Sequence, residues 1–170
     1  QTESLEYTEL ADGTLAVSGI GTFEGPPQVI PETAPDGTPI TRILKNAFRE
    51  CKTLRSVHIP DSIVEIEEWA FAFSEIAYVR LPDTLTSIEP FVFYSCMRLK
   101  SIHIPSGVQS IGDDSFCLCT ALTSLDIPAS VQSIGKSSFS HCFSLTSIVI
   151  PSTVKSLDDN AFSYCDSLQE

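Results

Sequence analysis

Apolar and polar positions recur with a fixed period along most of this chain. The sequence after residue 53 divides into one unit of 22 residues and four of 23, which begin at Leu54, Ile76, Leu99, Leu122 and Leu145. Each unit reads LxxIxIP, then VxxI, then a small residue and Phe, as in LKSIHIPSGVQSIGDDSFCLC. One unit has too few apolar residues to form a core of its own, so neighbouring units must stack and share one. The period therefore predicts a single solenoid domain.

The first half of a unit predicts a strand. Apolar and polar residues alternate in LxxIxIP, so Val57 and Ile59 should point inward from a parallel strand. Ser56 and His58 should point outward. Pro60 follows at once, and because proline cannot donate a ladder hydrogen bond it should end the strand.

The second half of a unit predicts a shorter strand and a turn. VxxI favours the second strand, and the stretch around Phe (46–50, or 159–163) favours a helical or 3₁₀ turn that fits the short arc left in the coil. The expected fold is a right-handed solenoid of parallel β coils. Its core should contain one file of aligned phenylalanines: Phe48, Phe71, Phe93, Phe116, Phe139 and Phe162.

The two ends of the chain differ from the repeats. LEYTELADGTLAVSGIG alternates around Asp12-Gly13 and predicts a β-hairpin over residues 4–20. We assign residues 1–28 to this N-terminal cap and 29–170 to the repeats, the first of which is degenerate and carries a six-residue insertion within 32–39 as a surface loop. Leu168 opens another unit, so either the natural chain continues or the last coil is bare. A bare coil makes dimerisation through the C-terminal end plausible.

Cysteine occupies a repeat position. Cys96, Cys119, Cys142 and Cys165 are spaced by 23 residues, and without a CxxC pair they do not predict zinc. Buried free thiols are our main interpretation. Adjacent coils are also close enough for a disulfide such as Cys96–Cys119. We expect Cys117, which interrupts the pattern, to be the most exposed thiol.

Charge and hydropathy exclude several functions. The formal net charge of −12 opposes binding to nucleic acids and to anionic lipid, because such binding needs Lys and Arg to replace counterions. No apolar run is long enough to cross a bilayer. We interpret Gln1 as the start of a mature chain from which a signal or lipoprotein segment has been removed.

The repeat also resembles a known family. LKSIHIPSGVQSIGDDSFCLC is similar to the BspA-like subclass of leucine-rich repeats, and the resemblance covers residues 29–168. The chain departs from that pattern at Phe73-Ser74, where Cys is expected, and at the extra Cys117. The resemblance implies a leucine-rich-repeat solenoid and a non-enzymatic protein of a host-associated microbe, secreted or on the cell surface, that mediates adhesion or protein recognition. The alternative is a structural spacer that holds another domain away from the cell surface.

Outward strand positions supply the candidate binding site. They form two columns on the face that we expect to be concave, one nearly all serine and one variable. A variable exposed column is typical of a rigid, acidic recognition surface for an extracellular protein or glycan, although a solvated face without a partner fits equally well. Tyr78 and Arg80 are the expected anchors, since aromatic and Arg side chains dominate hot spots. The candidate ligand-binding residues are Ser56, His58, Tyr78, Arg80, Ser101, His103, Ser124 and Asp126.

The same columns do not predict catalysis, a metal or a cofactor. Ser101, His103 and Asp126 could mimic a catalytic triad, but an open surface cannot exclude water and no oxyanion loop follows. A weak surface pair between His103 and Asp126 is the expected outcome. His58 and His103 lie two coils apart, roughly 10 Å from the strand spacing, which is too far to share one ion.

Acidic residues follow VxxI in several units. Calcium could bridge such a stripe, but the residues lack EF-hand or nonapeptide order. We therefore expect a solvated face. The residues concerned are Glu67, Glu68, Glu89, Asp113, Asp114, Asp158 and Asp159.

Overall fold

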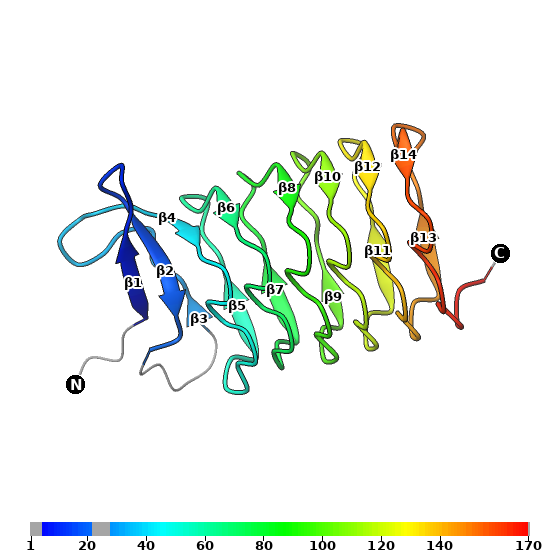
Figure 1. The fold of residues 1–170 in the computed structure, drawn as a ribbon, viewed down its shortest axis with the longest axis horizontal. Helices are drawn as coiled ribbons and strands as arrows, with labels where there is room; N and C mark the ends of the chain where they lie inside the picture. Colours follow the sequence, from blue (N-terminus) through cyan, green and yellow to red (C-terminus); the bar gives the residue numbers. More distant parts are fainter. Residues whose placement is uncertain (1–4, 22–27, 170) are drawn as a thin grey trace.

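The chain forms a parallel β-solenoid of about six turns. The computed structural model describes residues 5–21 and 28–169. In Figure 1 the coils follow one another from the N-terminal hairpin to the C-terminus, and each contributes one strand to a lower row and one to an upper row. The expected fold class is confirmed.

The lower row contains the strands of the LxxIxIP segments. It divides into a four-stranded sheet, in the order β3-β5-β7-β9, and a pair, β11-β13. Its strands are β3 (Gln28–Val29), β5 (Ser56–His58), β7 (Tyr78–Arg80), β9 (Ser101–Ile102), β11 (Ser124–Asp126) and β13 (Ser147–Val149).

The upper row contains the strands of the VxxI segments. β4 and β6 join the N-terminal hairpin in one sheet, and the other four form a second sheet in the order β14-β12-β10-β8. Its strands are β4 (Ile40–Ile43), β6 (Glu65–Ile66), β8 (Ser87–Ile88), β10 (Ser110–Ile111), β12 (Ser133–Ile134) and β14 (Ser156–Leu157).

Strand register places equivalent residues of successive coils beside one another. Val57 pairs with Val79 in parallel, and Ile111 pairs with Ile134. Val57 and Ile59 are buried, as the alternation predicts. The sequence period is therefore also the spatial period, so a substitution at one position always faces the same position in the next coil.

The turn around each phenylalanine is not helical, and that prediction is wrong. No helix is assigned anywhere in residues 5–21 and 28–169. Each turn instead places two non-glycine residues at positive φ, four positions apart, such as Phe91 at 61° and Ser95 at 56°. This conformation alternates the peptide directions, so the amides of Phe91 and Ser95 donate to carbonyls of the next coil, Asp113 at 3.0 Å and Cys117 at 2.7 Å. The turn is thus a third hydrogen-bonded side of the coil.

The file of phenylalanines is confirmed. Successive rings are stacked, with centroids 5.5 Å apart for Phe71 and Phe93 and 5.3 Å for Phe116 and Phe139. The file continues to Phe162, which is partly buried. Burial of these rings supplies a large share of the apolar area that two neighbouring coils remove from water.

The N-terminal hairpin covers the first coil. β1 (Glu6–Glu9) pairs antiparallel with β2 (Leu15–Gly19), and β2 then pairs parallel with β4. Gly13 has a φ of 83°, a conformation that glycine adopts without strain. The hairpin prediction is confirmed within the described residues, while residues 1–4 and 22–27 of the predicted cap lie outside them. The predicted insertion is also found, as a mostly exposed loop closed by a bridge between Thr33 and Pro39.

The cysteine column is part of the core. All six cysteines, which lie in the described part of the chain, are free thiols. Cys96 Sγ donates to the Phe71 carbonyl at 3.0 Å, and Cys119 Sγ donates to the Phe93 carbonyl at 3.2 Å. Cys142 and Cys165 make the equivalent bonds, so these four thiols each tie their coil to the preceding one. Ser74 takes the same place in the second repeat unit.

Burial depends on the neighbouring coil. Ile134 of β12 is 1% exposed, whereas Leu157, its partner in β14, is 49% exposed. The two residues hold the same position in the repeat and differ in having a following coil. Dimerisation through this end stays a prediction.

Removing one phenylalanine ring should destabilise the fold more in the middle of the file than at its end. We expect Phe116→Ala to lower the free energy of unfolding by about 3–5 kcal/mol, because it opens a cavity between two rings. Phe162→Ala, at the partly exposed end, should cost clearly less. Urea unfolding of both variants measures the difference. Equal losses of unfolding free energy would contradict the view that neighbouring coils share the burial of these rings.

Replacing either of two buried serines by alanine should stabilise the fold. The hydroxyls of Ser115 and Ser138 are buried without a hydrogen-bond partner in the described structure, and Ala47, Ala70 and Ala161 occupy the same column. An unpaired buried hydroxyl costs about 1–3 kcal/mol. Ser115→Ala should therefore raise the free energy of unfolding by roughly 1 kcal/mol. A loss of stability in calorimetry would show that the hydroxyl is paired in solution.

Alkaline pH should destabilise the fold through the cysteine column. Burial raises the pKa of the Cys96 thiol to about 12 and raises those of Cys119 and Cys142 well above the ordinary value. Unfolded thiols lose their proton near pH 8.5, so stability is complete below that pH and falls as pH rises toward the folded pKa values. Each thiol contributes at most about 1.4 kcal/mol per pH unit.

Serine variants provide the control for the alkaline loss. A triple variant with serine at these three positions, the residue that coil two already has at Ser74, should show a flatter decline between pH 8 and 11 in chemical unfolding. A profile identical to that of the parent protein would assign the loss to other groups.

Candidate functional site

The outward residues of the lower row lie together as predicted. Ser56, Tyr78 and Ser101 are paired in register across β5, β7 and β9, and His58 is paired with Arg80. Tyr78 is 51% exposed. The flat parallel backbone thus presents the two columns side by side on what we call the sheet face, the outward side of β5, β7 and β9.

The sheet face is interrupted after β9. No strand pairing joins β9 to β11 within residues 28–169, so Ser124 and Asp126 belong to a separate ladder with β13. The predicted pair between His103 and Asp126 is absent from the described ion pairs, and that prediction is wrong. The two coils still pack against each other, so the side chains lie on neighbouring coils without forming an ion pair.

Two shallow hollows flank the predicted anchors. One, of about 430 Å³, is lined by residues of β7 and β9 together with Leu81, Asp83 and His103, and the other, of about 390 Å³, by residues of β3, β5 and β7. Tyr78 and Arg80 border both hollows. Open hollows of this kind suit a macromolecular surface better than a small substrate, which needs an enclosing pocket.

The sheet face is not acidic, contrary to our expectation of an acidic recognition surface. Its outward residues in β5 and β7, with Ser101 and His103, include one arginine and two histidines and no carboxylate, and Asp83 is the one carboxylate that lines its two hollows in the described structure. The carboxylates lie instead along the segments that follow the upper row. The negative net charge therefore does not describe the face that we expect to bind.

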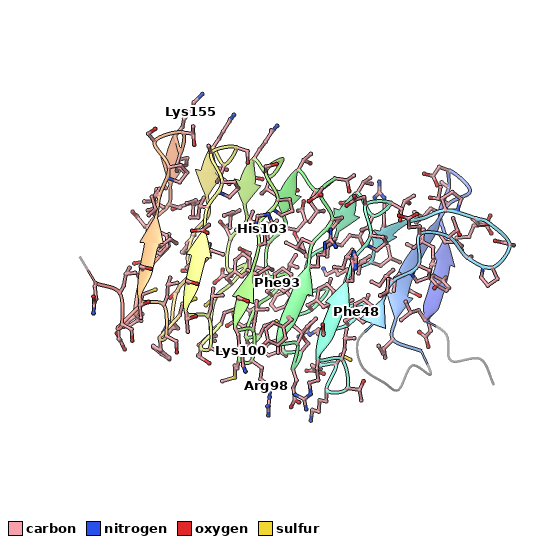
Figure 2. All side chains as sticks on the ribbon, turned by 180° about the vertical axis from the view of Figure 1, so that it is seen from behind. Phe48, Phe93, Arg98, Lys100, His103 and Lys155 are labelled. Atoms are coloured by element: carbon pink, nitrogen blue, oxygen red, sulfur yellow. The ribbon has the colours of Figure 1, made fainter. Side chains whose placement is uncertain are left out.

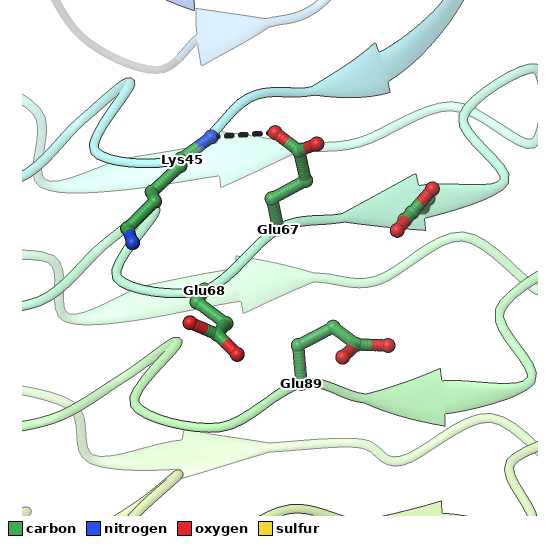
Figure 3. A pocket seen from close by; sticks show the side chains of 5 residues that line it. Lys45, Glu67, Glu68 and Glu89 are labelled. Carbon is green, nitrogen blue, oxygen red and sulfur yellow. Dashed lines mark hydrogen bonds between the residues drawn. The ribbon is translucent and has the colours of Figure 1, made fainter.

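The acidic residues after the upper row have structural partners. Figure 3 shows four glutamates and Lys45 around a hollow of about 230 Å³, with the Lys45 amide donating to Glu67 at 2.8 Å. Asp113 likewise accepts the Lys136 amide from the next coil at 2.8 Å. The described residues contain no group of three or more His, Cys, Asp or Glu arranged to hold a metal ion. Glu67 and Asp113 therefore bond neighbouring coils, whereas Glu89 and Asp158 accept hydrogen bonds within their own coils. The calcium alternative gains no support.

Cys117 is buried, and the prediction of an exposed thiol is wrong. The residue is 6% exposed, and burial, with the nearby Asp114 carboxylate, raises its pKa to about 11. A thiol that stays protonated is a poor nucleophile. The sequence could not show that this side chain is buried, because Cys117 stands outside the repeated cysteine column.

An aromatic cluster on the turn side was not predicted. Trp69 stacks on Phe91 with centroids 4.2 Å apart, and Phe73 and Tyr94 pack edge to face. The Arg49 guanidinium lies 4.9 Å from the Trp69 ring centroid. The ring faces of Trp69 are thus occupied by Phe91 and Arg49, so the cluster stabilises the outside of the first turns.

A cluster of cations at the start of the lower-row strands was also missed. Arg55 and Arg98 both face Glu75, and Lys100 lies near the ring of Tyr78. In Figure 2, Arg98 and Lys100 lie at one edge of the solenoid and Lys155 at the opposite edge. The sequence feature that could have indicated this cluster was the one repeat unit of 22 residues, which ends at Glu75.

Comparison with known proteins agrees with the geometry. The BspA-type leucine-rich-repeat region matches residues 38–170 in six copies. Comparison with curated protein sequences found no match. In residues 5–21 and 28–169, no helix has the length and apolar content needed to cross a membrane.

Three solved structures are similar to this chain. A leucine-rich cell surface protein of Faecalibacterium prausnitzii is 35% identical with a TM-score of 0.75, over 84% of this chain and 36% of its own. A leucine-rich-repeat protein of Bacteroides ovatus is 31% identical with a TM-score of 0.88, over 99% and 45%. A leucine-rich-repeat protein of T. pallidum is 25% identical with a TM-score of 0.83, over 100% and 90%.

This chain therefore spans less than half of the length of the first two proteins. The match of the repeat over most of the sequence nevertheless settles its classification. The chain belongs to the BspA-type leucine-rich-repeat family.

Proposed function

We propose that this chain is a non-enzymatic recognition module of a secreted or cell-surface protein, which mediates adhesion by binding an extracellular macromolecule through its sheet face. The observation that carries the proposal is the position of Tyr78 and Arg80. Both side chains are exposed, lie at the centre of one continuous sheet and border both of its hollows. Aromatic and arginine side chains at the centre of an interface dominate binding energy.

The rest of the sheet face supports the same role. Serines, which have small side chains, lie on either side of Tyr78, so the ring stands above its neighbours. His58 and His103 flank Arg80 in the variable column. The backbone beneath is held by ladders on three sides of the coil, so binding requires little ordering of main chain. The similarity to a protein described as a leucine-rich cell surface protein supports the location.

A spacer is the second candidate function. Stacked coils form a rod whose rigidity suits it to hold another domain at a distance. A spacer needs no particular outward residue, so replacement of Tyr78 and Arg80 separates the two functions.

Replacing the two anchors should abolish binding while leaving the fold intact. We expect Tyr78→Ala/Arg80→Ala to weaken binding to its partner on an array of extracellular-matrix proteins and glycans by roughly 30-fold or more, as for hot-spot residues. The unfolding free energy should change by less than about 1 kcal/mol, because both side chains are exposed.

Gln109→Ala/Gln132→Ala is the matched control, since both glutamines are exposed and flank strands of the upper row. The control should bind as the parent protein does. Equal binding by all three proteins, or binding by none, would favour the spacer over the recognition module.

A further inference from the structure

A recess lies at the edge of the sheet face where the lower-row strands begin. It coincides with a departure from the repeat pattern. Coil two is one residue short: only Glu75 separates Ser74, in the cysteine column, from the next aliphatic residue, where other units have two. The following position is Ala77, which lies in the same column as the long side chains of Arg55 and Lys100. The missing residue and the small side chain of Ala77 together leave a recess of about 320 Å³. Arg55, Glu75, Ala77 and Lys100 help to line it.

The recess holds more positive than negative charge. Glu75 Oε2 lies 2.5 Å from the nearest nitrogen of Arg55 and 3.8 Å from Nε of Arg98, so one carboxylate oxygen faces two guanidinium groups. The Lys100 ammonium lies 5.9 Å from the Tyr78 ring centroid and has no carboxylate among the described ion pairs. Three cations against one anion leave a local charge of +2 in a chain whose net charge is −12.

The cations are available to a ligand. The side chains of Arg55 and Arg98 are 49% and 61% exposed, against 30% for Glu75. Glu75 orients the two guanidinium groups over the recess, and their remaining N–H donors face solvent. Such a fork matches the paired oxygens of a sulfate or carboxylate group. The recess therefore has the chemistry of an anion site.

We propose that this recess binds sulfate or carboxylate groups of an anionic polysaccharide. Arg55 and Lys100 are two coils apart, roughly 10 Å by the strand spacing, so they can contact successive anionic groups of one extended chain. Beside the recess, the exposed Tyr78 ring and the hydroxyl of Ser101 offer contacts for sugar rings and their hydroxyls. An acidic peptide fits less well, because β7 is paired on both sides and offers no free strand edge for main-chain bonding.

The negative net charge does not oppose this site strongly. The glutamates of Figure 3 lie in β6 or directly after strands of the upper row, on a different side of the coil from the lower-row strand starts. At physiological salt, charges are screened over about 8 Å. The polysaccharide therefore experiences the local cations more than the distant carboxylates, and its binding should weaken steeply as salt is raised.

The test uses residues that the repeats themselves supply. Arg98→Ser/Lys100→Thr replaces each cation by the residue that later coils have in the same columns, Ser144 and Thr146. Lys136→Ser/Lys155→Gln is the control, since it also removes two positive charges and Lys155 lies at the opposite edge (Figure 2). Both variants have the same net charge, so only the position of the charges differs.

The measurement is the affinity for immobilised heparin, with hyaluronan, dextran and polyglutamate as competitors. Heparin should bind the parent protein, with roughly tenfold weaker binding by Arg98→Ser/Lys100→Thr and little change in the control. Competition by hyaluronan would show that carboxylate groups suffice, and its absence would assign the site to sulfate; either result supports the proposal.

Four results would overturn it: no binding by the parent protein, equal weakening in both variants, equal competition by neutral dextran, or stronger competition by polyglutamate than by any polysaccharide. The inference goes beyond the recognition role of the sheet face. Tyr78 borders both surfaces, but Arg98 and Lys100 are not among the candidate residues of the sheet face. The Arg98→Ser/Lys100→Thr variant therefore tests the recess, and Arg80→Ala alone tests the sheet face, so either conclusion can fail while the other stands.

Discussion

The structure depends on burial that successive coils share. No coil encloses its own core: each inner phenylalanine ring is covered by the rings before and after it, and the thiols from Cys96 onward in the cysteine column bond to carbonyls of the preceding coil. The contrast between buried Ile134 and half-exposed Leu157 shows the size of this dependence at a single repeat position. Stability therefore resides mainly in the interfaces between coils, as in other solenoids.

The turns that maintain these interfaces have a strained backbone. Each turn places two residues in the left-handed region, and they include bulky side chains such as Trp69 and Phe91, for which this conformation costs of order 1–3 kcal/mol. In return the turn amides donate to the next coil, so the backbone is hydrogen-bonded on the third side as well. The aromatic side chains then stack outside the coil and offset part of the strain.

Much of the fold could be predicted because its cause is periodic. The file of phenylalanines, the strand segments, the hairpin at Asp12-Gly13 and the inserted loop all follow from which positions repeat and where the repeat fails. The turn was predicted wrongly because positive φ at residues such as Phe91 has no sequence signature, unlike that at glycine. Cys117 was misplaced for a similar reason, since the direction of its side chain depends on that turn conformation.

The site was predictable only where it follows the period. Tyr78 and Arg80 stand out because they occupy outward positions of a strand, but the pair of His103 and Asp126 is not formed, because neighbouring outward positions do not fix the side-chain conformations that an ion pair needs. The cations of the recess lie more than forty residues apart in sequence, from Arg55 to Lys100, and only the stacking of coils brings them to one edge.

In a protein built of near-identical coils, a site must come from departures from the repeat. A fully regular coil would place the same surface at every step, so a feature found at one coil comes from residues or lengths that differ from the repeat. A unit that is one residue short removes a side chain at one point while the core columns on both sides stay in register, because Ile76 still packs under its neighbours. The cost to stability is therefore small, and a local shape and charge arise that the intact repeat lacks. Length changes in single units should thus guide the search for binding sites in this solenoid alongside the variable outward residues of its strands.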